Sequence, residues 1–362
     1  MDEILSEPPA SASFLRISEE AKKRIRQAMR RTLEQQLADV QKSLDYGDQT
    51  ACYCGPWSML TSDAGAWALH TRLSRELRAE LDGHFSDDII REVLLAAAGV
   101  KVSRTSLPED DIVLLDVLAH QCGFSLLAGR ERYRHRPDIG KGGACNTLEH
   151  IERPDERGGF RIVYIASNPS LAETAKLLEE VGEDELFGVL LGIPSCCREA
   201  FASFKAAAMA KQFDFIPLAL GNTQGDMPYD FWLNVAASYF GRSLLSFFPC
   251  SFRCPSASFI ARRTFEMLAD CDDTWARSFL ALQRTNILYT EYEGVYMFYP
   301  RLLDGSIHYG GKFKPTERNE LEALIRRGDR LAVRGKNHVD IYRGSHRIGV
   351  IEGKDVAVCA FW

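Results

Sequence analysis

Hydrophobic residues recur at helical spacing through the first half of the chain. Ile25, Met29, Leu33 and Leu37 lie four residues apart, which is typical of one face of a helix. The same kind of pattern predicts helices over residues 18–44, 87–98 and 109–122, followed by a strand over 123–128. Residues 130–159 are polar and rich in glycine, so we expect a long loop there.

In the middle of the chain, short apolar runs alternate with amphipathic segments. The runs predict strands over 160–166 and 243–248, and the amphipathic segments predict helices over 171–181, 198–211, 229–240 and 256–268. Further on, residues 288–299 and 331–360 alternate β-branched and aromatic residues with turn signals such as Asp304-Gly305, which favours a small antiparallel sheet.

These patterns together predict a mixed α/β (α+β) fold. Its parts are a helical N-terminal region, a central α/β core and a small antiparallel sheet at the C-terminus. We expect four stretches: a loose lead-in over 1–16, a mainly helical region over 17–150, the α/β core over 151–285 and a β-rich region over 286–362.

Composition narrows the classes of function. The net charge of −6 disfavours a surface devoted to nucleic acid, although the basic helix at Lys22–Arg31 leaves RNA contact open. The acidic start, Met1-Asp2-Glu3, is unlike a signal peptide, and no apolar run approaches the roughly 20 residues that a membrane helix needs. We therefore expect a soluble, cytoplasmic protein without a membrane partner. The sequence leaves homo-oligomerisation open.

Ten cysteines in a chain of this size, in a reducing compartment, are expected to be thiols, metal ligands or redox groups. Cys52, Cys54 and Cys145 occur in short polar or glycine-containing segments that carry weak signals. Two other segments share one construction, in which an apolar run reaches a proline, then cysteines, then a predicted helix. They are Ile193-Pro194-Ser195-Cys196-Cys197 and Phe248-Pro249-Cys250-Ser251-Phe252-Arg253-Cys254.

Cysteines in the first turn of a helix are stabilised as thiolates by the free amide groups and the helix dipole. If the two proline turns meet, they present four sulfurs to one centre. The sequence thus predicts a metal site made of Cys196, Cys197, Cys250 and Cys254. An all-sulfur ligand set slightly favours an iron–sulfur cluster, with zinc as the alternative. A redox dithiol and buried structural cysteines also remain open.

Other residues near the cysteines are candidates for catalysis. Neighbouring side chains tend to diverge, so one of the adjacent pair could be a free sulfur, and Cys197 is our choice. Arg198 and Arg253 lie next to cysteines and could hold a substrate carboxylate or offset thiolate charge. The polar segment at residues 221–226 could contact substrate, and Asn234 lies on the predicted helix that follows it.

The two cysteine segments also carry a resemblance. Gly192-Ile193-Pro194-x-Cys196-Cys197-x-x-x-Phe201 and Phe248-Pro249-Cys250-Ser251-x-x-Cys254 together resemble an uncharacterised microbial family, the domain-of-unknown-function family numbered 483. The resemblance covers about residues 160–270. It implies that the four cysteines belong to one site and that Asn234 lies near it, and it implies no reaction.

Three functions follow as hypotheses. The first is an enzyme that uses an iron–sulfur cluster or another metal on a small polar or peptide-derived substrate. The second is a zinc-stapled module that binds RNA or a protein partner. The third is a metal-free thiol redox protein, in which Cys196 and Cys197 would form a strained disulfide.

Overall fold

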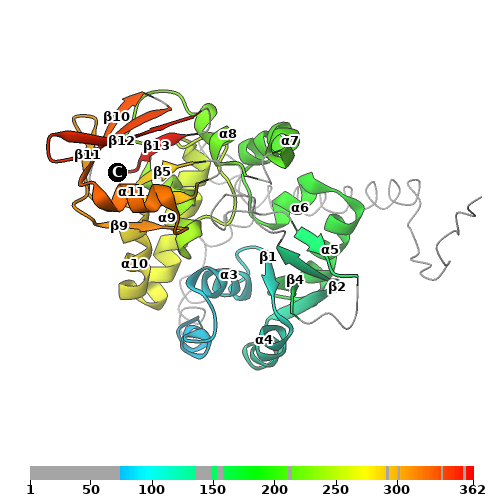
Figure 1. The fold of residues 1–362 in the computed structure, drawn as a ribbon. Helices are drawn as coiled ribbons and strands as arrows, with labels where there is room; N and C mark the ends of the chain where they lie inside the picture. The colour runs from blue at the N-terminus through cyan, green and yellow to red at the C-terminus, as the bar shows by residue number, and fades with distance from the viewer. Residues whose placement is uncertain are drawn as a thin grey trace, which may run out of the picture.

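The structure is a computed structural model that describes residues 74–135, 148–152, 158–210, 214–290, 293–300, 302–335, 337–353 and 356–362. It confirms the mixed α/β fold, with antiparallel sheets at the C-terminus (Figure 1). The predicted helix over 18–44 and the lead-in over 1–16 lie outside the described residues, as do Cys52, Cys54 and Cys145.

The first sheet is antiparallel, with the strand order β1-β4-β2-β3. Its strands are β1 (Ser103–Leu107), β2 (Ser125–His135), β3 (Leu148–His150) and β4 (Phe160–Ala166). Helices α3 (Asp87–Ala97) and α4 (Glu109–Cys122) pack on one face, and α5 (Pro169–Val181) and α6 (Asp184–Leu190) lie toward the other (Figure 1). Alternation along β4 explains this layering, because Val163 and Ile165 join the first core while Ile162 and Tyr164 join the second.

This sheet contains strands from both sides of residue 150, where the sequence pattern predicts a change of region. β1 and β2 come before that point and both pair with β4, which comes after it. β2 also continues to His135, inside the stretch for which we predicted a loop. The pairing with β4 and β3 is a tertiary interaction that extends a polar segment beyond what its own pattern suggests.

Helices dominate the centre of the chain. They are α7 (Ser195–Ala210), α8 (Ile216–Gly221), α9 (Pro255–Cys271) and α10 (Asp273–Gln283), with two 3-10 turns, η2 (Phe231–Leu233) and η3 (Val235–Phe240). The expected helix over 229–240 is therefore wrong in kind, since Asn234 (φ −71°, ψ 75°) interrupts it between the two 3-10 turns. The expected strand over 243–248 is also wrong, because that segment is irregular.

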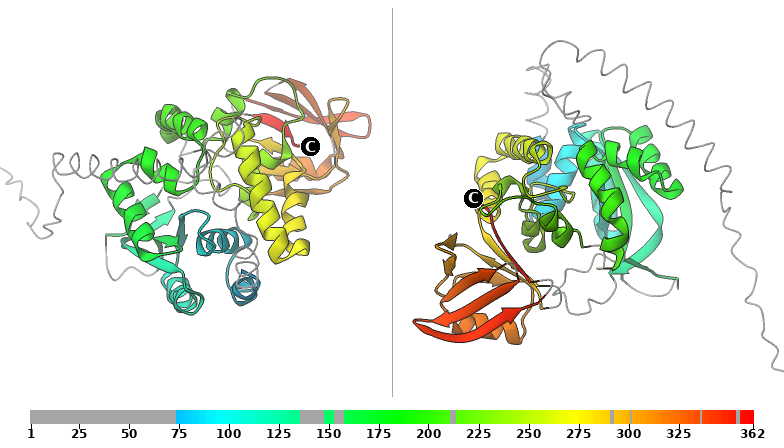
Figure 2. Two further views of the ribbon diagram at one scale, coloured as in Figure 1. Left: turned by 180° about the vertical axis from the view of Figure 1, so that it is seen from behind. Right: turned by 90° about the horizontal axis from the view of Figure 1, so that it is seen from above.

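The C-terminal part contains two antiparallel sheets around a separate core (Figures 1 and 2). One sheet has the order β12-β11-β10-β8-β7 and the other β13-β5-β6-β9. Their strands are β5 (Asn286–Tyr289), β6 (Val295–Phe298), β7 (Leu302–Leu303), β8 (Ser306–His308), β9 (Phe313–Pro315), β10 (Arg330–Gly335), β11 (His338–Arg343), β12 (His346–Glu352) and β13 (Ala357–Ala360). Helix α11 (Glu320–Arg327) packs through Leu321 and Ile325 into the core of these sheets.

The first sheet and the C-terminal sheets lie at opposite ends of the described part, with α3 and α9 between them (Figures 1 and 2). The largest core extends across this middle region and includes Cys197 and Cys254. No helix in the described ranges is both long enough and apolar enough to cross a membrane.

Candidate metal centre

Two helix starts bring the cysteines together, as the repeated proline–cysteine pattern predicts. Helix α7 begins at Ser195, directly after Pro194, and the Pro194 carbonyl accepts hydrogen bonds from the amides of Cys197 (3.0 Å) and Arg198 (2.9 Å). Cys196 and Cys197 therefore both lie in the first turn of the helix. A proline at this point is compatible with a helix start because its missing amide hydrogen is not needed there.

The second helix start is built around Cys254. The residue is the N-cap of α9, with extended backbone (φ −69°, ψ 114°), and Pro255 occupies the first helical position. Its sulfur accepts a hydrogen bond from the Ala257 amide at 3.5 Å. Cys250 stands four residues earlier in the irregular turn that leads into this cap. Two amide-rich helix starts thus face the same sulfur group, which favours thiolate over thiol.

The four sulfurs form one compact group. The Sγ atoms of Cys196 and Cys254 are 3.6 Å apart, those of Cys197 and Cys254 3.8 Å, and those of Cys196 and Cys197 4.0 Å. All four Sγ atoms, that of Cys250 included, lie within 4.8 Å of one another. This is the one group of three or more potential metal ligands among the described residues. The group could hold a metal ion.

These distances match a particular coordination geometry. A tetrahedral zinc ion bound to four thiolates at about 2.3 Å requires sulfurs about 3.8 Å apart. An iron–sulfur cluster spreads four cysteines over two or four iron atoms, so the sulfurs bound to different irons stand further apart than the ligands of a single ion. The spacing between these sulfurs therefore suits a single ion.

Burial and hydrogen bonding divide the four cysteines into two pairs. Cys197 and Cys254 are 1% and 3% exposed, whereas Cys196 and Cys250 are half-buried. Each buried sulfur also accepts an amide hydrogen bond, Cys197 from the amide of Cys250 (3.4 Å) and Cys254 from that of Ala257. The centre thus has a closed inner side and an outer side that solvent can reach.

The cluster needs a cation to be fully ionised. Hydrogen bonds from Cys197, and also from Cys250 and Cys254, hold the pKa of Cys196 far below its ordinary value. The pKa of Cys197 is raised above its ordinary value, chiefly by its hydrogen bond to Cys196. Four thiolates at this spacing repel one another, and a divalent ion at their centre would offset much of that repulsion.

The three other predicted site residues contact protein groups around the cysteines. Arg198 is held by Glu185, with Nε 3.1 Å from Oε1, and it donates to the carbonyl of Ile193. Arg253 lies 5.8 Å from the ring centre of Tyr229 and donates to the carbonyls of Asp226 and Pro228. Arg198 therefore holds the segment directly before Cys196, and Arg253 holds the loop at residues 226–228 beside the second cysteine turn.

Asn234 is buried, and its contacts connect it with the end of α10. Its Nδ2 donates to the carbonyl of Gln283 (3.0 Å), the carbonyl of Leu282 (3.3 Å) and Oγ1 of Thr285 (3.2 Å). These bonds hold the break between η2 and η3 against the α10–β5 connection. A catalytic role for Asn234, Arg198 or Arg253 stays a prediction.

The polar segment at 221–226, which the sequence suggested as a substrate contact, supports the second cysteine turn. Asn222 donates from Nδ2 to the carbonyl of Cys250 at 2.8 Å. The hydroxyl of Thr223 accepts from the Phe252 amide at 2.8 Å and donates to the carbonyl of Ala219. The sequence analysis did not predict that this segment supports the cysteine turn. The signal that could have indicated it is the pair of hydrogen-bonding side chains, Asn222 and Thr223, directly after α8.

Aromatic stacking joins the two cysteine turns on one side. Phe201 stacks on Phe215 with ring centroids 5.0 Å apart, and Phe215 stacks on Phe248 at 5.3 Å. Phe201 lies one helical turn after Cys197, and Phe248 lies two residues before Cys250. The stack therefore links the two ligand segments through contacts that do not involve the sulfurs.

The chain matches no protein-family model, no curated protein and no solved structure. The resemblance to the family numbered 483 thus stays a prediction.

Proposed function

We propose that Cys196, Cys197, Cys250 and Cys254 bind one zinc ion in a tetrahedral site, and that this ion has a structural role. The observation that carries the proposal is the separation of the sulfurs, 3.6 to 4.0 Å for three pairs, which suits one ion with four thiolate ligands. Four protein ligands leave no open position for substrate, and that is the usual arrangement of a structural zinc site.

The position of the centre supports this role. The first ligand pair belongs to α7, which follows the helices of the first sheet, and the second pair belongs to the start of α9, which packs on α10. A shared ion ties these two parts of the chain together at the largest core. This role favours the zinc-stapled protein over the iron–sulfur enzyme among the hypotheses drawn from the sequence.

A single iron ion that transfers electrons is the second candidate. The half-buried position of Cys196 and Cys250 supports it. Tetrahedral sulfur sites accept iron as well as zinc, and the half-buried Cys196 and Cys250 would give an electron a short path to a partner. The short separations of three sulfur pairs support a single ion over the iron–sulfur cluster that all-sulfur ligation suggested from the sequence, because a cluster spreads its cysteine ligands over more than one iron atom.

Metal analysis of the anaerobically purified chain tests the proposal. We expect one zinc per chain, no acid-labile sulfide and no visible absorption band. Cys197→Ser and Cys254→Ser should lose the ion, whereas Cys122→Ser, on α4 and away from the cluster, should retain it. Iron with sulfide would replace the proposal with a cluster, and one iron without sulfide would support the electron-transfer candidate. A metal-free chain in the wild type would contradict metal binding altogether.

A further inference from the structure

One edge of the first sheet is open over the start of β2. β2 pairs with β4 on one side from Ser125 to Ala128, whereas on its other side it pairs with β3 only from Tyr133 to His135. Within the described ranges, residues 125–130 of β2 therefore have one unpaired side. Successive residues of a strand alternate in direction, so half of these residues present their amide and carbonyl groups to this side.

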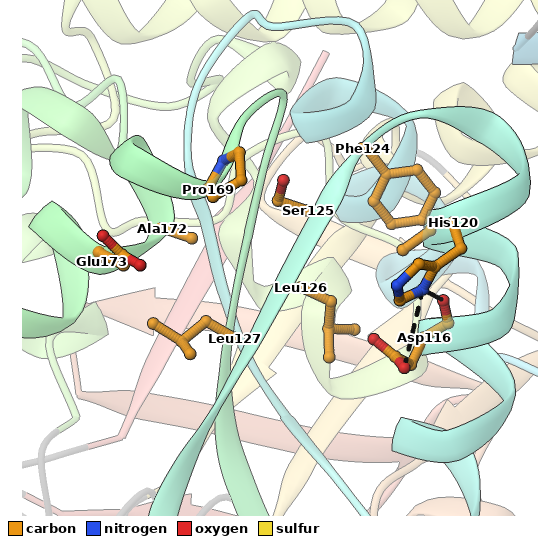
Figure 3. Close-up of a pocket in the computed structure, with 10 residues that line it drawn as sticks. Asp116, His120, Phe124, Ser125, Leu126, Leu127, Pro169, Ala172 and Glu173 are labelled. Atoms are coloured by element: carbon orange, nitrogen blue, oxygen red, sulfur yellow. Dashed lines mark hydrogen bonds and ion pairs between the residues drawn. The ribbon is translucent and has the colours of Figure 1, made fainter.

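A groove of about 330 Å³ runs along this open edge (Figure 3). Helix α4 forms one wall and the first turns of α5 form the other, with β2 at the bottom. Leu126 and Leu127 point to opposite sides of the strand, toward α4 and α5 respectively (Figure 3). Both leucines are only partly buried.

The groove has an apolar floor and an acidic rim. Leu126, Leu127 and the buried Ala119 and Ala172 supply the floor. Asp116 on α4 and Glu173 on α5 are exposed and stand on opposite walls (Figure 3). This pattern complements an extended peptide that offers its backbone to the edge, an apolar side chain to the floor and basic side chains to the rim.

His120 completes the α4 wall and is oriented by its own helix. Its Nδ1 lies 2.8 Å from the carbonyl oxygen of Asp116 and 3.8 Å from the Asp116 carboxylate (Figure 3). Val113 and Val117 of the same helix, outside the groove lining, are 61% and 50% exposed. These two valines would cover the outer residues of a peptide that extends beyond the edge strand.

We propose that the open edge of β2 binds an extended basic peptide segment of another protein, which adds to the first sheet as a fifth strand between α4 and α5. Backbone hydrogen bonds along Ser125–Ala128 hold the peptide, and Asp116 and Glu173 select Lys or Arg at its flanks. The register of β2 shifts between Ala128 and Arg132, so the regular edge ends there. The added strand is thus about four residues, or roughly 13 Å, long.

Peptide selection on the full chain tests this proposal. A phage-displayed library of random dodecapeptides is panned on the wild-type protein, and enriched sequences are synthesised for fluorescence anisotropy. We expect binders with an apolar residue flanked by Lys or Arg, and dissociation constants below about 100 µM. The variant Asp116→Lys/Glu173→Lys should bind them at least tenfold more weakly, while Glu317→Lys, an exposed acid in the C-terminal part, should bind them as the wild type does.

Backbone methylation identifies the binding mode. Peptides N-methylated at alternate residues should lose binding in one register and keep it in the other, because only every second amide of an added strand donates to the sheet edge. Hydrogen exchange should then show new protection at residues 125–128. The proposal is overturned if no peptide binds below about 100 µM, if both methylation registers bind equally, or if protection appears on another surface while residues 125–128 stay unprotected.

Discussion

A buried ion network beside the cysteine turns offers a stability prediction that the structure makes quantitative. Lys101, Glu92 and Arg91 are 6%, 6% and 3% exposed. The Lys101 ammonium donates to Glu92 and, at 2.8 Å, to the hydroxyl of Ser246, in the segment that leads to Cys250. Arg91 binds the other oxygen of Glu92 at 3.2 Å. Burial alone would raise the pKa of Glu92, but Lys101 and then Arg91 outweigh it and hold that pKa at about 2.

We expect Lys101→Met to lower the free energy of unfolding at pH 7 by about 3 kcal/mol, because it leaves the buried Glu92 with one cation instead of two. The pKa of Glu92 gives the combined effect of Lys101, Arg91 and burial. A folded value of about 2 against an ordinary value of 4.5 is worth about 3 kcal/mol. Since the folded pKa lies below the unfolded one, this stability is complete above pH 4.5 and is lost as the pH falls toward 2.

Urea unfolding at pH 7 and at pH 3 provides the measurement, with equal denaturant slopes as the condition for comparison. The difference in the free energy of unfolding between wild type and Lys101→Met should be smaller at pH 3. At that pH the wild type has already lost part of the stability that comes from the lowered pKa of Glu92. Glu92→Gln/Lys101→Met is the matched control and should be more stable at pH 7 than Lys101→Met, because it buries no underpaired carboxylate. A loss below about 1 kcal/mol at pH 7, or a gap independent of pH, would refute this reasoning.

Two further predictions concern single side chains. Thr223→Val removes the hydroxyl that accepts from the Phe252 amide. We therefore expect about tenfold weaker metal binding, measured in a competition with a chromogenic chelator. Unchanged affinity would show that the turn at Cys250 and Cys254 does not depend on this bond. Asn319 caps α11 by accepting from the Glu322 amide at 2.8 Å. Asn319→Ala removes this side-chain acceptor and should cost about 1 kcal/mol in urea unfolding, with no change in metal content. A loss of metal in Asn319→Ala would contradict the separation between the C-terminal core and the metal centre.

Local signals predicted several elements closely. Pro255 and the apolar spacing that follows it indicated α9, and the structure extends this helix only a few residues beyond the predicted range of 256–268. Glu109–Cys122 was predicted with the bounds that the structure shows, because acidic residues mark its start and Gly123, with φ 75°, ends it. These features depend on residues that are near one another in the sequence.

Elements that depend on distant partners were predicted less well. Asn234 ends one 3-10 turn and begins another because its side chain bonds to residues 282–285, about 50 positions away. The run at 243–248 is apolar enough for a strand, but the backbone amide of Ser243 is held by Asp88 of α3 at 2.9 Å. Neither contact can be read from the hydrophobic pattern of its own segment, because each depends on residues far away in the sequence.

The sequence predicted that the four cysteines form one group. It did not predict which of the sulfurs contact one another. Spacing along the chain showed that two similar turns carry two cysteines each. It could not show that the adjacent Cys196 and Cys197 both reach Cys254, because this depends on how the first turn of α7 meets the start of α9. The choice of Cys197 as the free sulfur stays a prediction. Cys197 is 1% exposed, whereas Cys196 and Cys250 are half-buried.

X-ray absorption at the edge of the bound metal tests the central claim most directly, because it measures the coordination itself. For the zinc-loaded protein we predict four sulfur neighbours at about 2.3 Å and no metal–metal scattering. Fewer than four sulfurs would show that one of the cysteines is not a ligand. Iron with a second metal at short range would contradict the account, because it would mean that the four cysteines hold a cluster and not a single ion.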